Sequence, residues 1–119
     1  MRIAANPEFW KELDKLIAES SIIIDRPKAS VHPAWPEIIY PLDYGYLDGT
    51  SSGDGEGIDI WLGSERDRGL TAVFVTVDSV KRDSEIKLIA GCTEDEIRLI
   101  DAFYNGYDSM KGLLILRED

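Results

Sequence analysis

The sequence predicts an α+β domain in which a small curled sheet or barrel is covered by helices. Amphipathic helical patterns lie at 6–20 and 94–105, and short apolar, β-branched runs fill much of the chain between them. Such a mixture is typical of α+β folds. With 119 residues, the chain is long enough to bury roughly two-thirds of its unfolded surface around one core. We therefore expect a single domain over 1–119.

The first helix is predicted over 6–20 because its start signals and its apolar spacing agree. Asn6 is a suitable N-cap and Pro7 suits the first helical position. Apolar residues follow along one face at Phe9, Trp10, Leu13, Leu16 and Ile17. The next run, SIIIDRP at 21–27, is β-branched and stops at a proline, so we expect a strand there.

The middle of the chain is predicted to be mostly irregular. Three prolines flank a brief apolar segment, which leaves one short strand at 37–40 between two loops. Four glycines then make 49–57 irregular. The following run, GIDIWLG at 57–63, alternates in the way a strand does, with Asp59 on the face opposite the isoleucines.

The second half of the chain predicts three more strands and one helix. Thr93 and Glu96 form a capping box at the start of the helix expected at 94–105. The strands are the apolar runs at 69–80, 85–91 and 111–118.

Composition limits the possible partners. The formal net charge of −10 disfavours nucleic acid, whose binding depends on Lys and Arg. No apolar run approaches the roughly 20 residues that span a bilayer, and the N-terminus does not resemble a secretory signal, so we expect a cytoplasmic protein without membrane contact. The single cysteine, Cys92, is interpreted as a buried small residue without chemistry.

Acidic residues gather in the glycine-rich segment, where no basic residue accompanies them. Asp54 and Glu56 lie in the turn and Asp59 lies just inside the next strand. Convergent carboxylates repel one another and need a shared proton or cation, and hard oxygen ligands favour magnesium, manganese or calcium. The simpler interpretation is that these acids are solvated turn residues. Glu85 and Lys87, two residues apart in a predicted strand, would place a metal ligand beside a phosphate-binding cation.

The segment YPLDYGYLDGTSSGDGEGIDIWLG, at 40–63, resembles the signature of the family I soluble inorganic pyrophosphatases. In that family a Y-P-x-x-Y-G-Y segment precedes a D-G-D-P-x-D loop. Two further segments are similar more weakly: IIIDRP at 22–27 resembles an early acidic strand, and EIKLIAG at 85–91 resembles a D-x-K-L strand. The resemblance implies a small OB-like β-barrel flanked by an N-terminal and a C-terminal helix.

The resemblance also implies roles for individual residues. Glu56 matches the acid that helps activate the attacking water, Tyr44 the tyrosine at the electrophilic phosphate, and Lys87 the phosphate-binding lysine. For the late metal-binding aspartate, Asp83 is the better candidate and Asp78 is the weaker one. The implied metal-binding and metal-adjacent carboxylates are Asp25, Asp54, Asp59, Asp83 and Glu85. Magnesium is the implied cofactor, with manganese as a second possibility, and inorganic pyrophosphate is the implied small-molecule substrate.

Three departures from the family pattern keep other functions open. Glu56 stands where the family has Asp, the region 28–39 is shortened, and the neutral Asn105 occupies a lysine position. Arg26, Lys28 and His32 are candidates for the missing phosphate-binding groups. The alternatives are a hydrolase of another phosphoanhydride and a non-catalytic metal-binding OB-like module. Because the family forms oligomers, we also expect a homo-oligomer.

Overall fold

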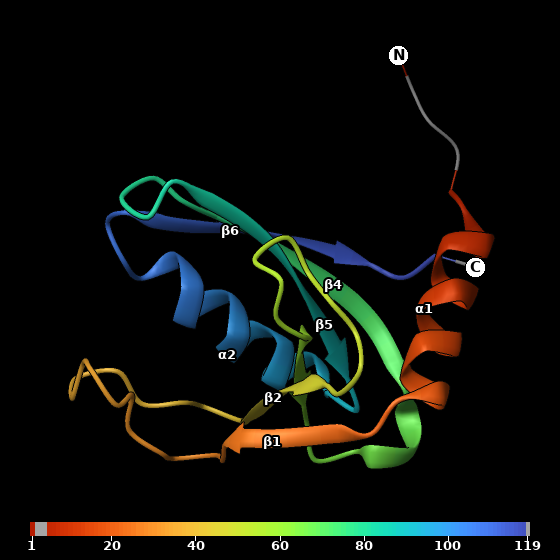
Figure 1. Cartoon of the computed structure of the whole chain (residues 1–119), viewed down its shortest axis with the longest axis horizontal. Helices are drawn as coiled ribbons and strands as arrows, with labels where there is room; N and C mark the ends of the chain where they lie inside the picture. The colour runs from red at the N-terminus through yellow and green to blue at the C-terminus, as the bar shows by residue number, and fades with distance from the viewer. Residues whose placement is uncertain (2–4, 119) are drawn as a thin grey trace.

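The computed structural model describes residues 1 and 5–118, and it has an α+β fold with a curved, OB-like sheet (Figure 1). The predicted fold class is confirmed, including a helix before the sheet and a second helix near the C-terminus. In chain order the elements are α1 (Pro7–Glu19), β1 (Ile22–Arg26), β2 (Asp43–Leu47), β3 (Ile58–Leu62), the 3-10 turn η1 (Arg66–Arg68), β4 (Leu70–Asp78), β5 (Asp83–Ala90), α2 (Glu94–Asn105) and β6 (Met110–Leu116).

The six strands form one sheet in the order β1-β2-β3-β5-β4-β6. Neighbouring strands are antiparallel except β3 and β5, which run parallel. Within the described chain, β1 and β6 are therefore the two edges of the sheet. The β3/β5 contact matters most for function, because it brings Asp59 beside Lys87 in register.

The strands differ from the sequence prediction at two places. The strand expected at 37–40 is wrong: this segment makes only an isolated bridge, Val31 to Ile39, because the surrounding prolines cannot continue a ladder. Conversely, β2 was not predicted. Its sequence, DYGYL, has no β-branched residue and a central Gly45, and both features lower strand propensity. Gly45 is needed there, because a Cβ would lie 1.8 Å from the carbonyl oxygen of Ile23 in β1.

One face of the sheet is covered by α1, which lies at one end of the sheet in Figure 1. The predicted N-cap is present: Asn6 Oδ1 accepts a hydrogen bond of 3.2 Å from the Phe9 amide. Trp10 is the buried anchor of the helix. The buried residues of this cluster are Trp10, Leu47, Ile60, Leu70, Val73, Leu88 and Ala90.

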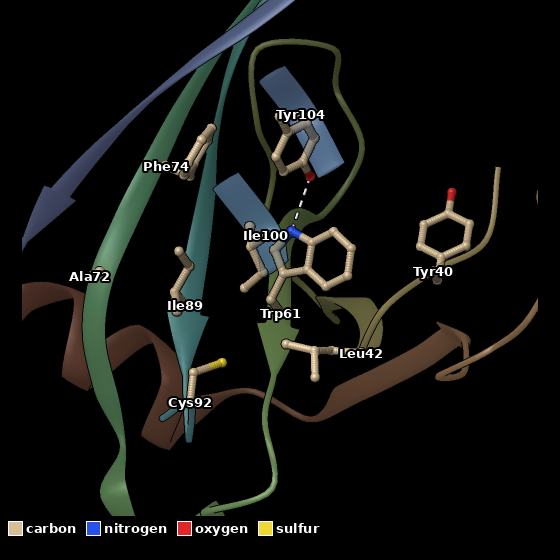
Figure 2. Packing of buried hydrophobic residues seen from close by; sticks show 9 residues of the cluster. All are labelled: Tyr40, Leu42, Trp61, Ala72, Phe74, Ile89, Cys92, Ile100 and Tyr104. Atoms are coloured by element: carbon tan, nitrogen blue, oxygen red, sulfur yellow. Dashed lines mark hydrogen bonds between the residues drawn. The ribbon is translucent and has the colours of Figure 1, made fainter. Parts of the chain in front are cut away.

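The opposite face is covered by α2, and it carries the aromatic core shown in Figure 2. The capping box of Thr93 and Glu96 forms as predicted. Trp61 is fully buried, and its indole Nε1 donates a hydrogen bond of 3.0 Å to the Tyr104 hydroxyl. Cys92 is also fully buried, and burial raises the pKa of its thiol to about 12, which agrees with a structural role. None of the described helices is both long and apolar enough to cross a membrane.

Candidate active site

The sheet face under α2 carries Tyr44, Asp59, Glu85 and Lys87 from three strands. Asp59 of β3 and Lys87 of β5 are direct partners in the parallel ladder. Glu85 precedes Lys87 by two residues in β5, so both side chains lie on the same face. Tyr44 of β2 pairs with Trp61 and packs against its ring, with centroids 4.7 Å apart.

Lys87 is the centre of this group. Its Nζ donates hydrogen bonds to Asp59 Oδ2 at 2.6 Å, to Glu85 Oε2 at 2.6 Å and to the Tyr44 hydroxyl at 3.0 Å. The Lys87 side chain is only 9% exposed, whereas those of Asp59 and Glu85 are 25% and 19% exposed. A buried ammonium is thus held between two carboxylates that still reach solvent.

The surroundings keep Lys87 charged and Tyr44 neutral. Burial alone would lower the pKa of Lys87, but interactions with Tyr104, Asp59 and Glu85 outweigh it and raise that pKa above its usual value. For Tyr44, burial is the largest cause and raises the pKa of the phenol strongly, with further contributions from Tyr104 and Asp59. The group therefore offers a fixed positive donor and a neutral hydroxyl at neutral pH.

Tyr104 of α2 and Trp61 of β3 pack beside this group. Their rings meet edge to face, with centroids 6.0 Å apart, and the indole–hydroxyl hydrogen bond joins them (Figure 2). Burial raises the pKa of Tyr104, so it too stays neutral. Tyr104 is not among the site residues that the sequence predicted. Its contact with Trp61, 43 residues away, has no local sequence signal.

The acidic loop before β3 is tightly folded around Asp54. Asp54 Oδ1 accepts hydrogen bonds from the Ser52 hydroxyl at 2.6 Å and from the Glu56 amide at 2.9 Å. These two interactions, in that order, lower the pKa of Asp54 against a small opposing effect of burial, and the Glu85 side chain adds a weaker lowering. Asp54 thus faces Glu85, while the Glu56 side chain has no hydrogen bond or ion pair with any described residue.

The remaining predicted carboxylates lie apart from this group. Asp25 lies where the β1/β2 register shifts, and Asp83 begins β5; among the described residues neither carboxylate has a hydrogen bond or ion pair to the others. Asp83 does share its strand face with Glu85. Asp78, the weaker candidate, is buried, and its Oδ1 accepts from the amides of Val80 and Lys81 in the β4–β5 turn.

Asn105 has a structural role. Its side-chain Oδ1 accepts from the Gly112 amide at 2.9 Å, and its Nδ2 donates to the Gly112 carbonyl at 3.2 Å. The same Nδ2 reaches the carboxylate of Asp101 at 3.1 Å. A lysine has no acceptor and could not form this two-way pair. The neutral residue at this position therefore joins the end of α2 to β6.

The candidate phosphate-binding residues differ in the hydrogen bonds and ion pairs that their side chains already make. His32 Nδ1 accepts from the amides of Ala34 and Trp35, so it holds a loop turn. Arg26 pairs with Tyr44 across the β1/β2 ladder, and its guanidinium donates to the Asp25 carbonyl without an ion pair to any described residue. Lys28 donates its backbone amide to Asp43 Oδ1 at 2.8 Å. Arg26 is the direct ladder partner of Tyr44, the tyrosine of the site.

The donor set suits a divalent metal, although the described residues include no group of three His, Cys, Asp or Glu side chains arranged as a formed metal site. Asp59 and Glu85 both contact Lys87, and Asp54 faces Glu85. Three carboxylates against one ammonium leave an excess of negative charge. Their oxygens are the hard ligands that Mg²⁺ and Mn²⁺ prefer. The donor types thus suit such an ion, while in this structure Asp59 and Glu85 are paired with Lys87.

Comparison with solved structures supports the fold. The chain is similar to an inorganic phosphatase from Anaplasma phagocytophilum, with a TM-score of 0.55 and 14% identity over 80% of this chain and 81% of that one. It is also similar to an inorganic pyrophosphatase from Helicobacter pylori, with a TM-score of 0.54 and 14% identity over 98% of this chain and 88% of the other. No protein-family model and no curated protein sequence matches the chain. The chain thus has a pyrophosphatase-like fold.

Proposed function

We propose that this chain, as one pyrophosphatase-like domain over 1–119, hydrolyses inorganic pyrophosphate to two phosphates with the help of a divalent metal. The observation that carries this proposal is the contact of Lys87 with Asp59, Glu85 and Tyr44 on one sheet face. The fold shared with an inorganic pyrophosphatase adds support. A charged donor beside carboxylates with excess negative charge can bind a phosphate and its metal together.

In this proposal Asp54, Asp59 and Glu85 would hold Mg²⁺ or Mn²⁺, while Asp25 and Asp83, which make no hydrogen bond or ion pair with these three described residues, are acids of the surroundings. When bound, such an ion makes water more acidic at neutral pH and offsets charge on phosphate oxygens.

The chain's own groups bind and orient the substrate. Lys87 donates to a phosphate oxygen in exchange for one of its present hydrogen bonds, because Asp59, Glu85 and Tyr44 take all three of its N–H donors. Its ammonium is kept charged by the same surroundings. Tyr44, neutral and hydrogen-bonded to Lys87, positions that ammonium and contacts the phosphate with its hydroxyl. Glu56 in the acidic loop accepts the proton of the attacking water. Preorganised donors of this kind stabilise charge that develops in the transition state.

The deciding experiment is phosphate release from pyrophosphate by the parent protein and Asp59→Asn, each with magnesium and with a chelator. We expect magnesium-dependent release that Asp59→Asn reduces at least about a hundredfold. Glu12→Gln is the matched control, because Glu12 is an exposed acid on α1, on the other side of the sheet. Release that Asp59→Asn leaves unchanged would contradict the assigned role of Asp59.

A second candidate function is a non-catalytic metal-binding module. The ordered acidic loop around Asp54 keeps its carboxylate in place, while the neutral Asn105 stands where the family has a lysine, and this combination favours binding without turnover. Such a module would be stabilised against heat by Ca²⁺ or Mg²⁺ and would turn over neither pyrophosphate nor nucleoside triphosphates. Turnover of nucleoside triphosphates without turnover of pyrophosphate would instead assign the site to another phosphoanhydride.

A further inference from the structure

The outer edge of β6 has backbone groups that bind no other described residue. Arg117 N donates to Thr71 O, and Ser79 N donates to Ser109 O. These bonds show which opposed residues of the β4/β6 ladder are hydrogen-bonded pairs. In an antiparallel ladder the groups of alternate residues face the neighbouring strand. Odd-numbered residues of β6 therefore bond to β4, and the N–H and C=O groups of Leu114 and Leu116 face outward.

Asn105 occupies one half of this edge. Its side-chain amide satisfies both outward groups of Gly112, much as a neighbouring strand would. No comparable group among the described residues covers Leu114 or Leu116. The available edge is thus short and begins after Gly112.

A cavity of about 610 Å³ lies between this available edge and the first half of α2. Its apolar lining includes Cys92, Ile97, Leu114 and Leu116. The hydroxyl of Thr71, which also lines the cavity, is buried and has no hydrogen-bond partner among the described residues. Figure 1 shows the two elements that border the cavity, α2 and β6, which follow one another in the chain.

We propose that the available edge of β6 and the cavity beside it bind an extended peptide segment of a partner protein, which adds a strand to the sheet. Only a polypeptide backbone matches alternating N–H and C=O groups along a strand. Peptide residues opposite Leu114 and Leu116 would point toward the same face as those leucines, into the cavity. The segment should therefore carry apolar residues at alternate positions. The charged residues that line the cavity are Arg68, Glu94, Arg98 and Asp101, two of each sign, so charged peptide residues of either sign can find a partner at its border.

The same geometry disfavours a second copy of this chain as the occupant. Symmetric antiparallel pairing of two β6 strands centred on Leu113 or Leu114 would need the outward groups of Gly112, which Asn105 already binds. Only a short pairing centred on Ile115, confined to Leu114 and Leu116, is left to a second copy. The copies would also bring two strongly acidic chains together.

The test begins with selection of random linear dodecapeptides, displayed on phage, against the full-length protein. A synthetic copy of a selected peptide is then titrated while backbone amide exchange is followed by NMR. We expect apolar residues at alternate positions and at least tenfold slower exchange at Leu114 and Leu116. The amides of Leu113 and Ile115, already bonded to β4, should change little.

Two variants separate strand addition from other binding. Leu116→Pro removes an outward N–H and leaves the β4/β6 ladder intact, so it should weaken peptide binding at least tenfold while circular dichroism stays that of the parent. Leu113→Asp, on the face opposite the cavity, should leave binding unchanged. Failure to select any peptide overturns the proposal, as does a selected peptide that protects neither leucine amide or a β6-mediated dimer seen by light scattering.

Discussion

Replacing Lys87 with methionine tests the electrostatic balance of the site. The methionine fills similar volume without the charge, so Asp59 and Glu85 lose a shared ammonium that lies 2.6 Å from each. Their contacting oxygens can be no farther apart than twice that distance. At an effective dielectric near 20, two charges about 4–5 Å apart repel by roughly 3–4 kcal/mol.

The expected loss of stability is about 3 kcal/mol, the lower end of the range for breaking a buried pair. The lower end applies because the two carboxylates keep 25% and 19% of their side-chain surface exposed, which screens part of the repulsion. For a chain of this size, that loss corresponds to a decrease in Tm of roughly 10 °C. Urea unfolding and calorimetry in the presence of a chelator measure both quantities.

Magnesium should recover much of the lost stability in Lys87→Met and stabilise the parent less, because the variant lacks the competing ammonium. The double variant Lys87→Met, Glu85→Gln is the matched control: one carboxylate is neutralised, so repulsion and magnesium response should both decrease. Equal stability of Lys87→Met and the parent in chelator, or equal magnesium responses of the two, would refute this electrostatic reasoning.

Other expected outcomes concern stability away from the site. Asn105→Ala, which loses both hydrogen bonds to Gly112, should cost about 1–2 kcal/mol in urea unfolding. Gly45→Ala places a Cβ 1.8 Å from a β1 carbonyl and should cost about 3 kcal/mol or more; a cost near zero would show that β1 and β2 can separate without penalty. Arg117 lowers the pKa of Asp14 through paired hydrogen bonds of 2.8 Å. Asp14→Asn should therefore cost less than about 1 kcal/mol at neutral pH, and the difference should shrink below pH of about 4.

Local signals in the sequence predicted the helices well. Asn6 with Pro7, and Thr93 with Glu96, act within one helical turn, so their effect does not depend on the rest of the fold. The strand β2 depends instead on its neighbour. Gly45 lowers its intrinsic preference for a strand, yet the glycine is what allows β1 to approach. A single sequence gives no local sign of that approach.

The site was predictable only in part, for the same reason. The spacing of Glu85 and Lys87 predicted that both would lie on one face, and their side chains are in direct contact. The contact of Lys87 with Asp59 joins residues 28 positions apart through a parallel strand pair. Asp59 was expected in the site from the acidic cluster and from the family resemblance, but no periodic pattern indicated that its carboxylate would meet Lys87.

Asn105 shows how one residue can separate the fold from the chemistry of similar proteins. The resemblance implies a phosphate-binding lysine there, whereas the amide needs both its donor and its acceptor to bind Gly112. A lysine could supply charge but would leave the Gly112 amide without an acceptor. Asn105→Lys should therefore destabilise the α2–β6 junction, and any gain in phosphate binding would come with a loss of stability. The lack of a lysine at this position and the closed half of the β6 edge thus both follow from this one side chain.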